Sequence, residues 1–321
     1  MIDRRSILRA SASAFAAVGL SRPSSADAPL KIIVPYPAGS GSDVIARVIA
    51  AQLPSRINQT VIVLNQSGAS GYLATQAIHR ADPDGNSIIL TSSNHVLLAA
   101  VKKNLPFDVV EDFEPITQLC NGPLVVTVNP NFPATTVADL LEMARKTPNT
   151  ITYASSGTGS APHLAVELLS VMADVKFVHI PYRGGTPAAA DVIAGVVPFY
   201  FGSLATSLPF FESHQAIAMA QTPKNRLRFL PNLPTIAEQT GLDYDVQYWY
   251  GVLAPPRTSS SRIAQLNQAI NEIASTPQVA SFIEKQGFGV ESSTPAQFKR
   301  ILKDEAALWI KTARAANIQP E

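Results

Sequence analysis

The residues from Lys31 to Asp43 constrain the fold most strongly, because they place a strand, a small-residue loop and a helix start in succession. Ile32, Ile33 and Val34 form a β-branched run without polar alternation, which is typical of a strand covered on both faces in a parallel sheet. Helical spacing of apolar residues begins after Asp43. Backbone N–H groups and a helix dipole meet at such a turn and favour an anion. A tight turn without a ligand is the alternative interpretation.

Two nucleotide-binding motifs are missing from this loop. The sequence Gly-x-x-x-x-Gly-Lys-Ser/Thr is absent, and Gly39 and Gly41 lack the third glycine of the dinucleotide fingerprint. A nucleotide is therefore the weaker interpretation of the anion.

The strand, loop and helix order recurs along the chain. Strands are expected at 61–64, 87–91, 124–128, 151–154, 177–180, 197–201, 216–220 and 245–253, and helices at 137–146, 162–172 and 187–194. Such alternation predicts an α/β protein with doubly wound, mostly parallel sheets. About 290 residues after export exceed a usual single domain, so two domains are expected, with three helices closing the chain.

The N-terminus has the pattern of an export signal. Arg4 and Arg5 precede two apolar residues and Arg9, and a modestly apolar run from Ala10 to Leu20 follows. This pattern is typical of twin-arginine export, with the general secretory route as the alternative. Small residues at 26–28 favour cleavage there, so residues 1–28 are assigned to the signal. No other apolar stretch is long enough to span a bilayer.

Charge and cysteine content exclude several functions. The chain has 25 basic and 24 acidic residues, and loss of the signal leaves 21 and 22, without a basic run. Nucleic acid is therefore a poor partner. Cys120 is the single cysteine, so an intrachain disulfide is impossible and a small buried residue is expected. No histidine pair has metal-ligand spacing, and neither a metal nor another cofactor is expected.

Two further loops follow predicted strands. The loop 155–160 reads Ser-Ser-Gly-Thr-Gly-Ser and precedes Pro162, which suits the first turn of a helix. The loop 181–186 reads Pro-Tyr-Arg-Gly-Gly-Thr. In open α/β sheets ligands lie beyond the carboxyl ends of the strands, so these loops and the first one predict a ligand held between two domains. An ordinary serine-rich capping loop is the alternative for 155–160.

His163 raises the alternative of nucleophilic catalysis. Ser155 and Ser156 precede it, and a serine with a histidine base would make a periplasmic hydrolase. The Gly-x-Ser-x-Gly elbow is missing, however, and a ring at a helix start can simply bond to backbone. We therefore expect a binding protein and not an enzyme.

Several segments together indicate a family. They are 35–47 (Pro-Tyr-Pro-Ala-Gly-Ser-Gly-Ser-Asp-Val-Ile-Ala-Arg), 81–85 (Ala-Asp-Pro-Asp-Gly), 153–160 with His-Leu-Ala at 163–165, 179–185 (His-Ile-Pro-Tyr-Arg-Gly-Gly), 231–238 (Pro-Asn-Leu-Pro-Thr-Ile-Ala-Glu) and 249–255 (Trp-Tyr-Gly-Val-Leu-Ala-Pro). In these segments the chain resembles the extracytoplasmic solute receptors of the tripartite tricarboxylate transporter system, the Bug or TctC-like proteins.

The resemblance implies a two-lobed periplasmic binding protein of type II-like fold that closes on a small organic carboxylate by hinge motion. Lobe 1 would comprise 29–122 and 221–321, and lobe 2 would comprise 123–220. The partners implied are the carboxylate and integral membrane permease subunits, with the receptor itself a monomer. A solute sensor for two-component signalling shares the fold and remains an alternative. The ligand-binding residues implied are Tyr36, Pro37, Ala38, Gly39, Ser40, Gly41, Ser155, Ser156, Gly157, Thr158, Gly159, Ser160, His163, Tyr182, Gly184, Gly185, Thr186, Gly202 and Ser203.

One departure from the family pattern bears on specificity. Members commonly carry an acidic residue and Asn after the strand that ends here at Phe201, where this chain has Gly202 and Ser203. A carboxylate there would pair with the ammonium group of an amino-acid ligand. Its absence predicts a ligand without an amino group, such as a di- or tricarboxylate or an aromatic carboxylate.

Overall fold

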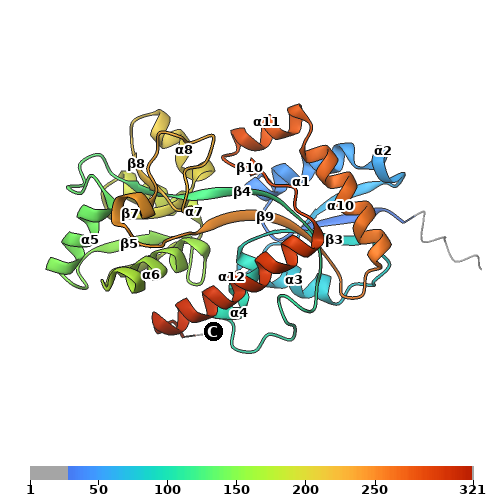
Figure 1. The fold of residues 1–321 in the computed structure, drawn as a ribbon, viewed down its shortest axis with the longest axis horizontal. Helices are drawn as coiled ribbons and strands as arrows, with labels where there is room; N and C mark the ends of the chain where they lie inside the picture. Colours follow the sequence, from blue (N-terminus) through green and yellow to red (C-terminus); the bar gives the residue numbers. More distant parts are fainter. Residues whose placement is uncertain (1–27, 320–321) are drawn as a thin grey trace, which may run out of the picture.

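A single strand divides the molecule into two halves. The structure, a computed structural model, describes residues 28–319. Its strands form a curled ten-stranded sheet in the order β2-β1-β3-β9-β4-β7-β5-β6, with β8 and β10 also paired to β4. The 15-residue strand β4 (Glu114–Val128) runs through both halves, and Figure 1 shows it with β9 across the middle of the molecule.

The first half of the sheet contains three parallel strands next to an antiparallel centre. β1 (Leu30–Val34) lies between β2 (Val61–Asn65) and β3 (Ser87–Ser92) and is parallel to both. β9 (Gln247–Ala254) is antiparallel to β3 and to residues 114–123 of β4. The short β10 (Gly289–Val290) pairs with β4 beside it.

The second half repeats this plan. β5 (Thr152–Ser155) lies between β6 (Val178–Pro181) and β7 (Phe199–Ser203), all three parallel. β7 and β8 (Ile217–Gln221) are antiparallel to residues 124–128 of β4. Each half is therefore a mostly parallel α/β unit, and the expected two-lobed architecture is confirmed.

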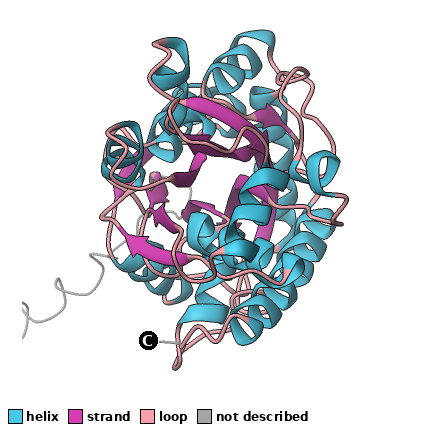
Figure 2. Ribbon diagram, turned by 90° about the vertical axis from the view of Figure 1, so that its left-hand side faces the viewer, coloured by secondary structure: helices cyan, strands magenta, loops and turns pink. Residues whose placement is uncertain are grey.

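Helices surround the strands, as Figure 2 shows. In the first half they are α1 (Gly41–Gln52), α2 (Pro54–Ile57), the 3₁₀ turn η2 (Ala69–Gly71), α3 (Tyr72–His79), α4 (Asn94–Val101), α10 (Ser260–Ala274) and α11 (Pro277–Lys285). In the second half they are α5 (Val137–Lys146), α6 (Ala161–Ala173), α7 (Gly185–Ile193), α8 (Leu204–Glu212) and α9 (Ile236–Thr240). The last helix, α12 (Pro295–Ala315), packs on α4, β4 and α6 and so touches both halves.

Local chemistry accounts for where the helices start. Thr136 and Asp139 form a reciprocal capping box at α5, which begins at the predicted residue. Thr294 and Gln297 form another at α12, where Pro295 occupies the first turn. Such caps satisfy N–H groups that would otherwise have no partner.

The strand expected at 124–128 starts earlier than expected, because Asn121-Gly122-Pro123 lies within β4. β4 continues through it: Pro123 faces Gln247 at the end of the β9 pairing, and Leu124 faces Ser203 at the start of the β7 pairing. A Cβ on Gly122 would lie 2.6 Å from the Gly287 carbonyl oxygen, so only glycine fits there. The chain therefore passes between the halves without leaving the sheet.

The chain was expected to return from the second half to the first near residue 221, but the residues that follow still contact the second half. The Val246 N–H donates to the Thr222 carbonyl, the Thr222 N–H donates to that of Leu124, and Gln221 forms a bridge with Thr235. Helix α9 packs on α5. We propose that the chain returns to the first half near Gln247, with residues 222–246 belonging to the second.

Buried side chains join the two halves. One apolar cluster extends from α4 through β4 to α6 and includes Phe298, Leu302 and Trp309 of α12. A second lies under α1 and α10 in the first half and includes Cys120, which is free and buried, as expected. Helix α12 thus closes a core shared by both halves.

A half-buried carboxyl group lies at the edge of this shared core. Glu305 of α12 accepts a hydrogen bond from Trp249 Nε1 at 2.9 Å. Burial raises the pKa of Glu305 to about 8; the Trp249 bond opposes the rise and the Asp245 carboxylate adds to it. Since this pKa exceeds that of an unfolded glutamate, ionisation of Glu305 destabilises the fold as pH rises toward about 8.

The variant Glu305→Gln tests this linkage, because its amide oxygen can still accept from Trp249. We expect the variant and the wild type to unfold at similar urea concentrations at pH 4.5. At pH 9 we expect the free energy of unfolding of the variant to exceed that of the wild type by roughly 2 kcal/mol, after a discount for solvent screening. The exposed Glu212→Gln is the control. A gain that is the same at both pH values contradicts the prediction.

Candidate ligand-binding site

The loop after β1 is organised by a buried carboxylate. Asp43 is 2% exposed; its Oδ2 accepts the Gly39 N–H at 2.8 Å and Arg47 Nε at 3.0 Å, and its Oδ1 accepts Asn65 Nδ2 at 2.8 Å. Burial opposes the charged form, but these hydrogen bonds hold the pKa of Asp43 below its usual value. Ser40 Oγ caps α1. The loop tip, residues 37–39, is exposed, so Asp43 fixes a loop whose apex faces solvent.

Tyr36 connects this loop to the next helix start. Its hydroxyl lies 2.6 Å from Ser92 Oγ and accepts from Asn94 Nδ2 at 3.0 Å. Asn94 Oδ1 in turn accepts the backbone N–H of Ala161, the first residue of α6, at 3.3 Å. The chain of contacts therefore crosses from the first half of the sheet to the second, and it brings the loops after β1, β3 and β5 together.

The serine loop after β5 folds around its own polar groups. Ser155 is fully buried; its Oγ lies 2.6 Å from His179 Nε2 and accepts the Gly157 N–H at 3.1 Å. Ser160 Oγ donates to the Gly157 carbonyl at 2.7 Å instead of capping α6. Ser155 thus shapes the loop from within, while Ser156 is half-buried and Thr158 is exposed at its tip.

Two stacked imidazole rings support this loop. The rings of His163 and His179 lie 3.9 Å apart at 15°, and His163 Nδ1 accepts the Gly159 N–H at 3.1 Å. This confirms that the His163 ring bonds to backbone. Burial lowers the pKa of His163 to about 3, helped by His179, and burial lowers the pKa of His179 to about 4. Both rings are neutral near pH 7.

The serine and histidine that are in contact are not the pair expected for a hydrolase, which was Ser155 or Ser156 with His163. Ser155 contacts His179 and not His163, and no part of the Ser155 side chain reaches solvent. A substrate therefore cannot approach its Oγ in this arrangement. Glu167 accepts the Tyr153 hydroxyl at 2.6 Å and lies 4.0 Å from His163 Nε2, which completes a buried polar cluster.

The third loop lies beside the second. A Cβ on Gly157 would lie 3.5 Å from the Tyr182 carbonyl oxygen. The Tyr182 hydroxyl donates to Asp191 Oδ2 at 2.6 Å, and burial, with that contact, raises the pKa of Tyr182 to about 12. Gly184 has a φ of +121°, a conformation that favours glycine, and Thr186 is exposed.

Tyr200 fills the space beside Gly202. A Cβ on Gly202 would lie 2.3 Å from the Tyr200 ring and 2.8 Å from Ser207 Oγ, and one on Gly185 would lie 2.7 Å from the Tyr200 hydroxyl. Ser203 Oγ pairs with Thr206 Oγ1 at 2.7 Å. An aromatic ring therefore occupies the position toward which a side chain at 202 would point.

The structure adds four polar residues to those expected. Ser92 ends β3 and Asn94 begins α4, and Tyr248 and Tyr250 of β9 lie edge to face with ring centroids 5.7 Å apart. Ser92 and Asn94 have a sequence signal, since β3 is a third strand followed directly by a helix start. The two tyrosines come from an antiparallel strand, and their position follows only from the pairing of β9 with β3.

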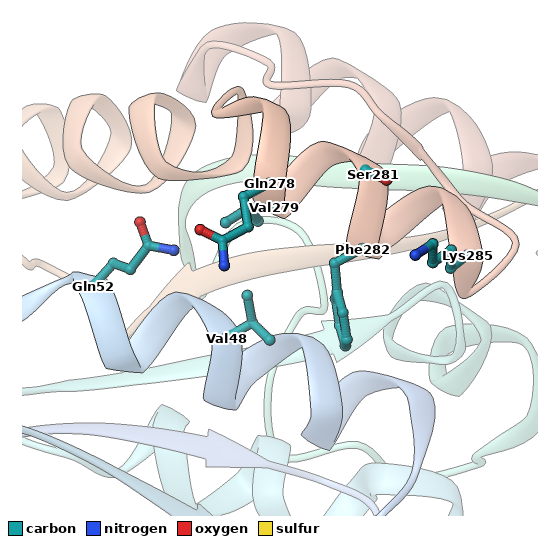
Figure 3. A pocket seen from close by; sticks show the side chains of 7 residues that line it. All are labelled: Val48, Gln52, Gln278, Val279, Ser281, Phe282 and Lys285. Atoms are coloured by element: carbon teal, nitrogen blue, oxygen red, sulfur yellow. The ribbon is translucent and has the colours of Figure 1, made fainter.

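A separate cavity lies on the outer side of the first half. It measures about 370 Å³ and lies between α1 and α11, as the close-up in Figure 3 shows. Its lining residues are Val48, Gln52, Gln278, Val279, Ser281, Phe282 and Lys285. None of the expected ligand-binding residues is among them, so this cavity is not the predicted site.

The two half-sheets joined through β4, with helix starts meeting between them, define a two-lobed solute-binding protein. Residues 45–318 match the family described as tripartite tricarboxylate transporter family receptor (TctC), and the chain belongs to this family. It is accordingly a solute-binding receptor and not an enzyme. In the part of the chain that the structure describes, no helix has the length and apolar character to cross a membrane.

Individual relatives agree in sequence and in fold. Protein BugT of Bordetella pertussis strain Tohama I is 31% identical over 93% of this chain and 94% of its own. The structure of Rpa4515 of R. palustris with adipate has a TM-score of 0.81 and 30% identity, covering 91% of this chain and 98% of that one. The periplasmic binding protein BugD has a TM-score of 0.78 and 27% identity, covering 91% and 99%.

The neutral histidines predict acid sensitivity. The pKa of His163 is lower in the folded protein than in an unfolded chain, so as pH falls from about 6.5 the unfolded state takes up a proton that the folded state does not. The wild type should lose free energy of unfolding between pH 6.5 and pH 3.5 for this reason. In His163→Asn, which keeps an acceptor for the Gly159 N–H, we expect this loss to be smaller by roughly 3 kcal/mol.

Urea unfolding at several pH values measures this effect. The matched control is His214→Asn, at an exposed position where the positive φ of 57° suits asparagine. The control should follow the wild-type pH profile. If His163→Asn also follows it, the burial argument is wrong.

Proposed function

We propose that this protein is an exported periplasmic receptor that binds a small organic carboxylate between its lobes and delivers it to an integral membrane permease. The observation that carries the proposal is the meeting of loops from both lobes, through Tyr36, Asn94 and Ala161. These loops lie at the carboxyl ends of parallel strands, where ligands bind in open α/β sheets.

The chemistry of the meeting point favours an anion. α1 and α6 both begin there, and each presents backbone N–H groups and the positive end of a helix dipole. Arg47, one turn after the start of α1, is already paired with Asp43. Recognition would therefore depend on backbone N–H groups and hydroxyls, which suits a carboxylate. The adipate in the Rpa4515 structure, which is 30% identical to this chain, supports the same class of ligand.

We propose different roles for the expected site residues. Those at the loop tips, Pro37, Ala38, Ser156 and Thr158, are partly or fully exposed. Ala38, Ser156 and Thr158 would meet the ligand through backbone N–H groups, whereas Pro37 has no N–H and would shape the loop. The buried residues Ser155, Ser160 and His163, with Asp43, would hold the loops in place. Loop 182–186 and residues 202–203 would shape the rest of the pocket.

The hinge proposal follows from the sheet. β4 and β9 are the strands that continue through the centre, so bending there would open and close the lobes. Permease binding would then depend on ligand, because the closed lobes present a joined surface. The export signal expected at residues 1–28 lies almost wholly outside the described residues, and periplasmic location, delivery to a permease and a monomeric state are parts of the proposal.

Tyr200 supports a ligand without an amino group. Its ring occupies the space beside Gly202, so no side-chain carboxylate of residue 202 lies at that point. An ammonium group placed at this point would lose its water without gaining an anionic partner, which is unfavourable. The proposed ligands are di- or tricarboxylates or aromatic carboxylates.

A thermal-shift screen of residues 29–321 tests the ligand class. The panel pairs succinate with aspartate, glutarate with glutamate, and adds adipate, citrate and benzoate. We expect a rise in melting temperature with one or more non-amino carboxylates and none with their amino partners, since a ligand at a hundred times its Kd adds about 2.7 kcal/mol. Shifts with amino acids alone would retain a receptor but contradict the role of Tyr200.

A charged substitution at the loop tip tests the location of the site. Ala38→Glu places a carboxylate at the start of α1, where it competes with an anionic ligand. We expect at least a tenfold loss in affinity for the carboxylate found in the screen, measured by isothermal titration calorimetry, or about 1.4 kcal/mol. Ala51→Glu, exposed at the other end of the same helix, is the control. Equal losses in both variants contradict the site.

A further inference from the structure

We propose that the Tyr200 hydroxyl and the N-terminus of α7 form a second anion subsite, which selects ligands that carry a second carboxylate. The proposal rests on the proposed function, because the first carboxylate is expected where α1 and α6 begin. It goes further by giving a donor role to a residue outside the three expected loops and by narrowing the proposed ligands to those with more than one carboxylate group.

The start of α7 presents N–H groups that lack an acceptor. The helix has 9 residues, and its N-cap residue Gly184 provides no side-chain hydrogen bond. The first N–H groups of a helix have no partner within it. Pro187 has no N–H, which leaves those of Gly185 and Thr186, and no residue in the described part of the chain accepts from them. A Cβ on Gly184 would meet nothing within 4 Å, so the space beside this helix start is open.

The Tyr200 hydroxyl points at this helix start. A Cβ on Gly185 would lie 2.7 Å from the Tyr200 hydroxyl oxygen. Tyr200 is only 2% exposed, yet its hydroxyl forms no hydrogen bond with any residue between 28 and 319. The neighbouring hydroxyls of Ser203 and Thr206, in contrast, bond to each other at 2.7 Å. A buried hydroxyl without a partner is costly, so Tyr200 has a donor that a ligand would satisfy.

Two glycines make room for this tyrosine. A Cβ on Gly202 would lie 2.3 Å from the Tyr200 ring, whereas the atom of Tyr200 nearest a Cβ on Gly185 is the hydroxyl oxygen. Neither glycine has a positive φ, so the space that Tyr200 needs, and not the backbone conformation, requires glycine at both positions. Gly185 thus accommodates the hydroxyl itself, which a phenylalanine at position 200 would not need.

The chemistry of this subsite suits a carboxylate. Burial raises the pKa of Tyr200, so its hydroxyl stays protonated near pH 7 and can donate. A charged acceptor makes the stronger hydrogen bond, and the positive end of the α7 dipole adds to the attraction. The charges nearest in sequence are Arg183, which is exposed, and Asp191, which accepts the Tyr182 hydroxyl at 2.6 Å. An ammonium group would meet the same positive dipole and be repelled.

The second subsite lies next to the first. A Cβ on Gly157 would lie 3.5 Å from the Tyr182 carbonyl oxygen, so the loops 155–160 and 181–186 lie side by side. Burial is the largest cause of the raised pKa of Tyr248, and the nearby Tyr200 adds to it. Because Tyr248 belongs to β9, Tyr200 lies toward the first lobe. A ligand with one carboxylate at the start of α1 and α6 would therefore reach α7 through a short carbon chain.

Matched pairs of acids test the ligand class. Succinate is paired with butanoate, glutarate with pentanoate and adipate with hexanoate, so both members of a pair have the same number of carbon atoms. In isothermal titration calorimetry of residues 29–321, we expect at least one dicarboxylate to bind roughly tenfold more tightly than its partner, or better. Equal affinities within the pairs that bind would overturn the second subsite and leave the proposed function in place.

The variant Tyr200→Phe isolates the hydroxyl. It keeps the buried ring, and the hydroxyl has no partner within the described residues, so the ligand-free melting temperature should not fall. The dicarboxylate should lose roughly tenfold in affinity or more, while its monocarboxylate partner keeps its affinity. Tyr72→Phe is the matched control, because the Tyr72 hydroxyl accepts from Gln76 within α3. It should change neither affinity.

Nuclear magnetic resonance adds a local readout. The amide protons of Gly185 and Thr186 should move downfield when the dicarboxylate saturates the wild type, and they should move less with its monocarboxylate partner. Amides that stay in place would overturn the subsite, as would a Tyr200→Phe variant that binds the dicarboxylate like the wild type or loses both acids equally. Binding of none of these acids would overturn the dicarboxylate class, and the proposed function would fall with it only if the thermal-shift screen also finds no carboxylate.

Discussion

The antiparallel pairing of β4 with β9 is the constraint on which the rest of the structure depends. It joins residues 114–123 to residues 247–254, and β4 then continues to pair with β7 and β8. Most of β4 is buried, so its backbone groups have to find partners within the sheet. The two lobes are therefore parts of one hydrogen-bonded sheet, so the proposed hinge motion would bend these central strands.

The antiparallel centre also decides where the loops lie. β1 and β3 in one lobe, and β5 and β7 in the other, are parallel strands on opposite sides of β4 and β9. Each is followed by a loop and a helix start at its carboxyl end. The hydrogen bonds of Asn94 to Tyr36 and to Ala161 show that the loops after β1, β3 and β5 come together. The proposed ligand site between the lobes would thus be a consequence of topology, and the loop residues would decide which ligand fits.

The sequence predicted elements whose evidence is local. The helix at 137–146 and the strands near 152–155 and 178–181 follow from apolar spacing, caps and turns, and the structure confirms them. The continuation of β4 through Asn121-Gly122-Pro123 was not predictable in this way. Glycine and proline usually end a strand, and here they are tolerated because Gly122 meets the Gly287 carbonyl and Pro123 lies where the pairing partner changes.

The candidate site, too, was predictable from local sequence only in part. The loops after β1, β5 and β6 were recognisable from their composition. The contact of His163 with His179 was not, because His163 lies on α6 and His179 on β6, and only the folded arrangement of these two elements places the rings 3.9 Å apart. The contacts of Asn94 were not recognisable either, since its partners Tyr36 and Ala161 are 58 and 67 residues away. Contacts between distant segments depend on the closed fold, which no local pattern contains.

The loops after β1 and β5 both lack an uncompensated negative charge, but they achieve this by different chemistry. The first uses the carboxylate of Asp43, whose negative charge is balanced by Arg47 and by the N–H of Gly39. The second uses the imidazoles of His163 and His179, which burial keeps neutral. An uncompensated carboxylate behind either loop would repel an anion at the helix start in front of it. In the first loop the charge is paired, and in the second the rings that bond the loop are neutral, while the Glu167 carboxyl group behind them accepts from Tyr153 and has its pKa raised by burial. Both helix dipoles can therefore attract a carboxylate.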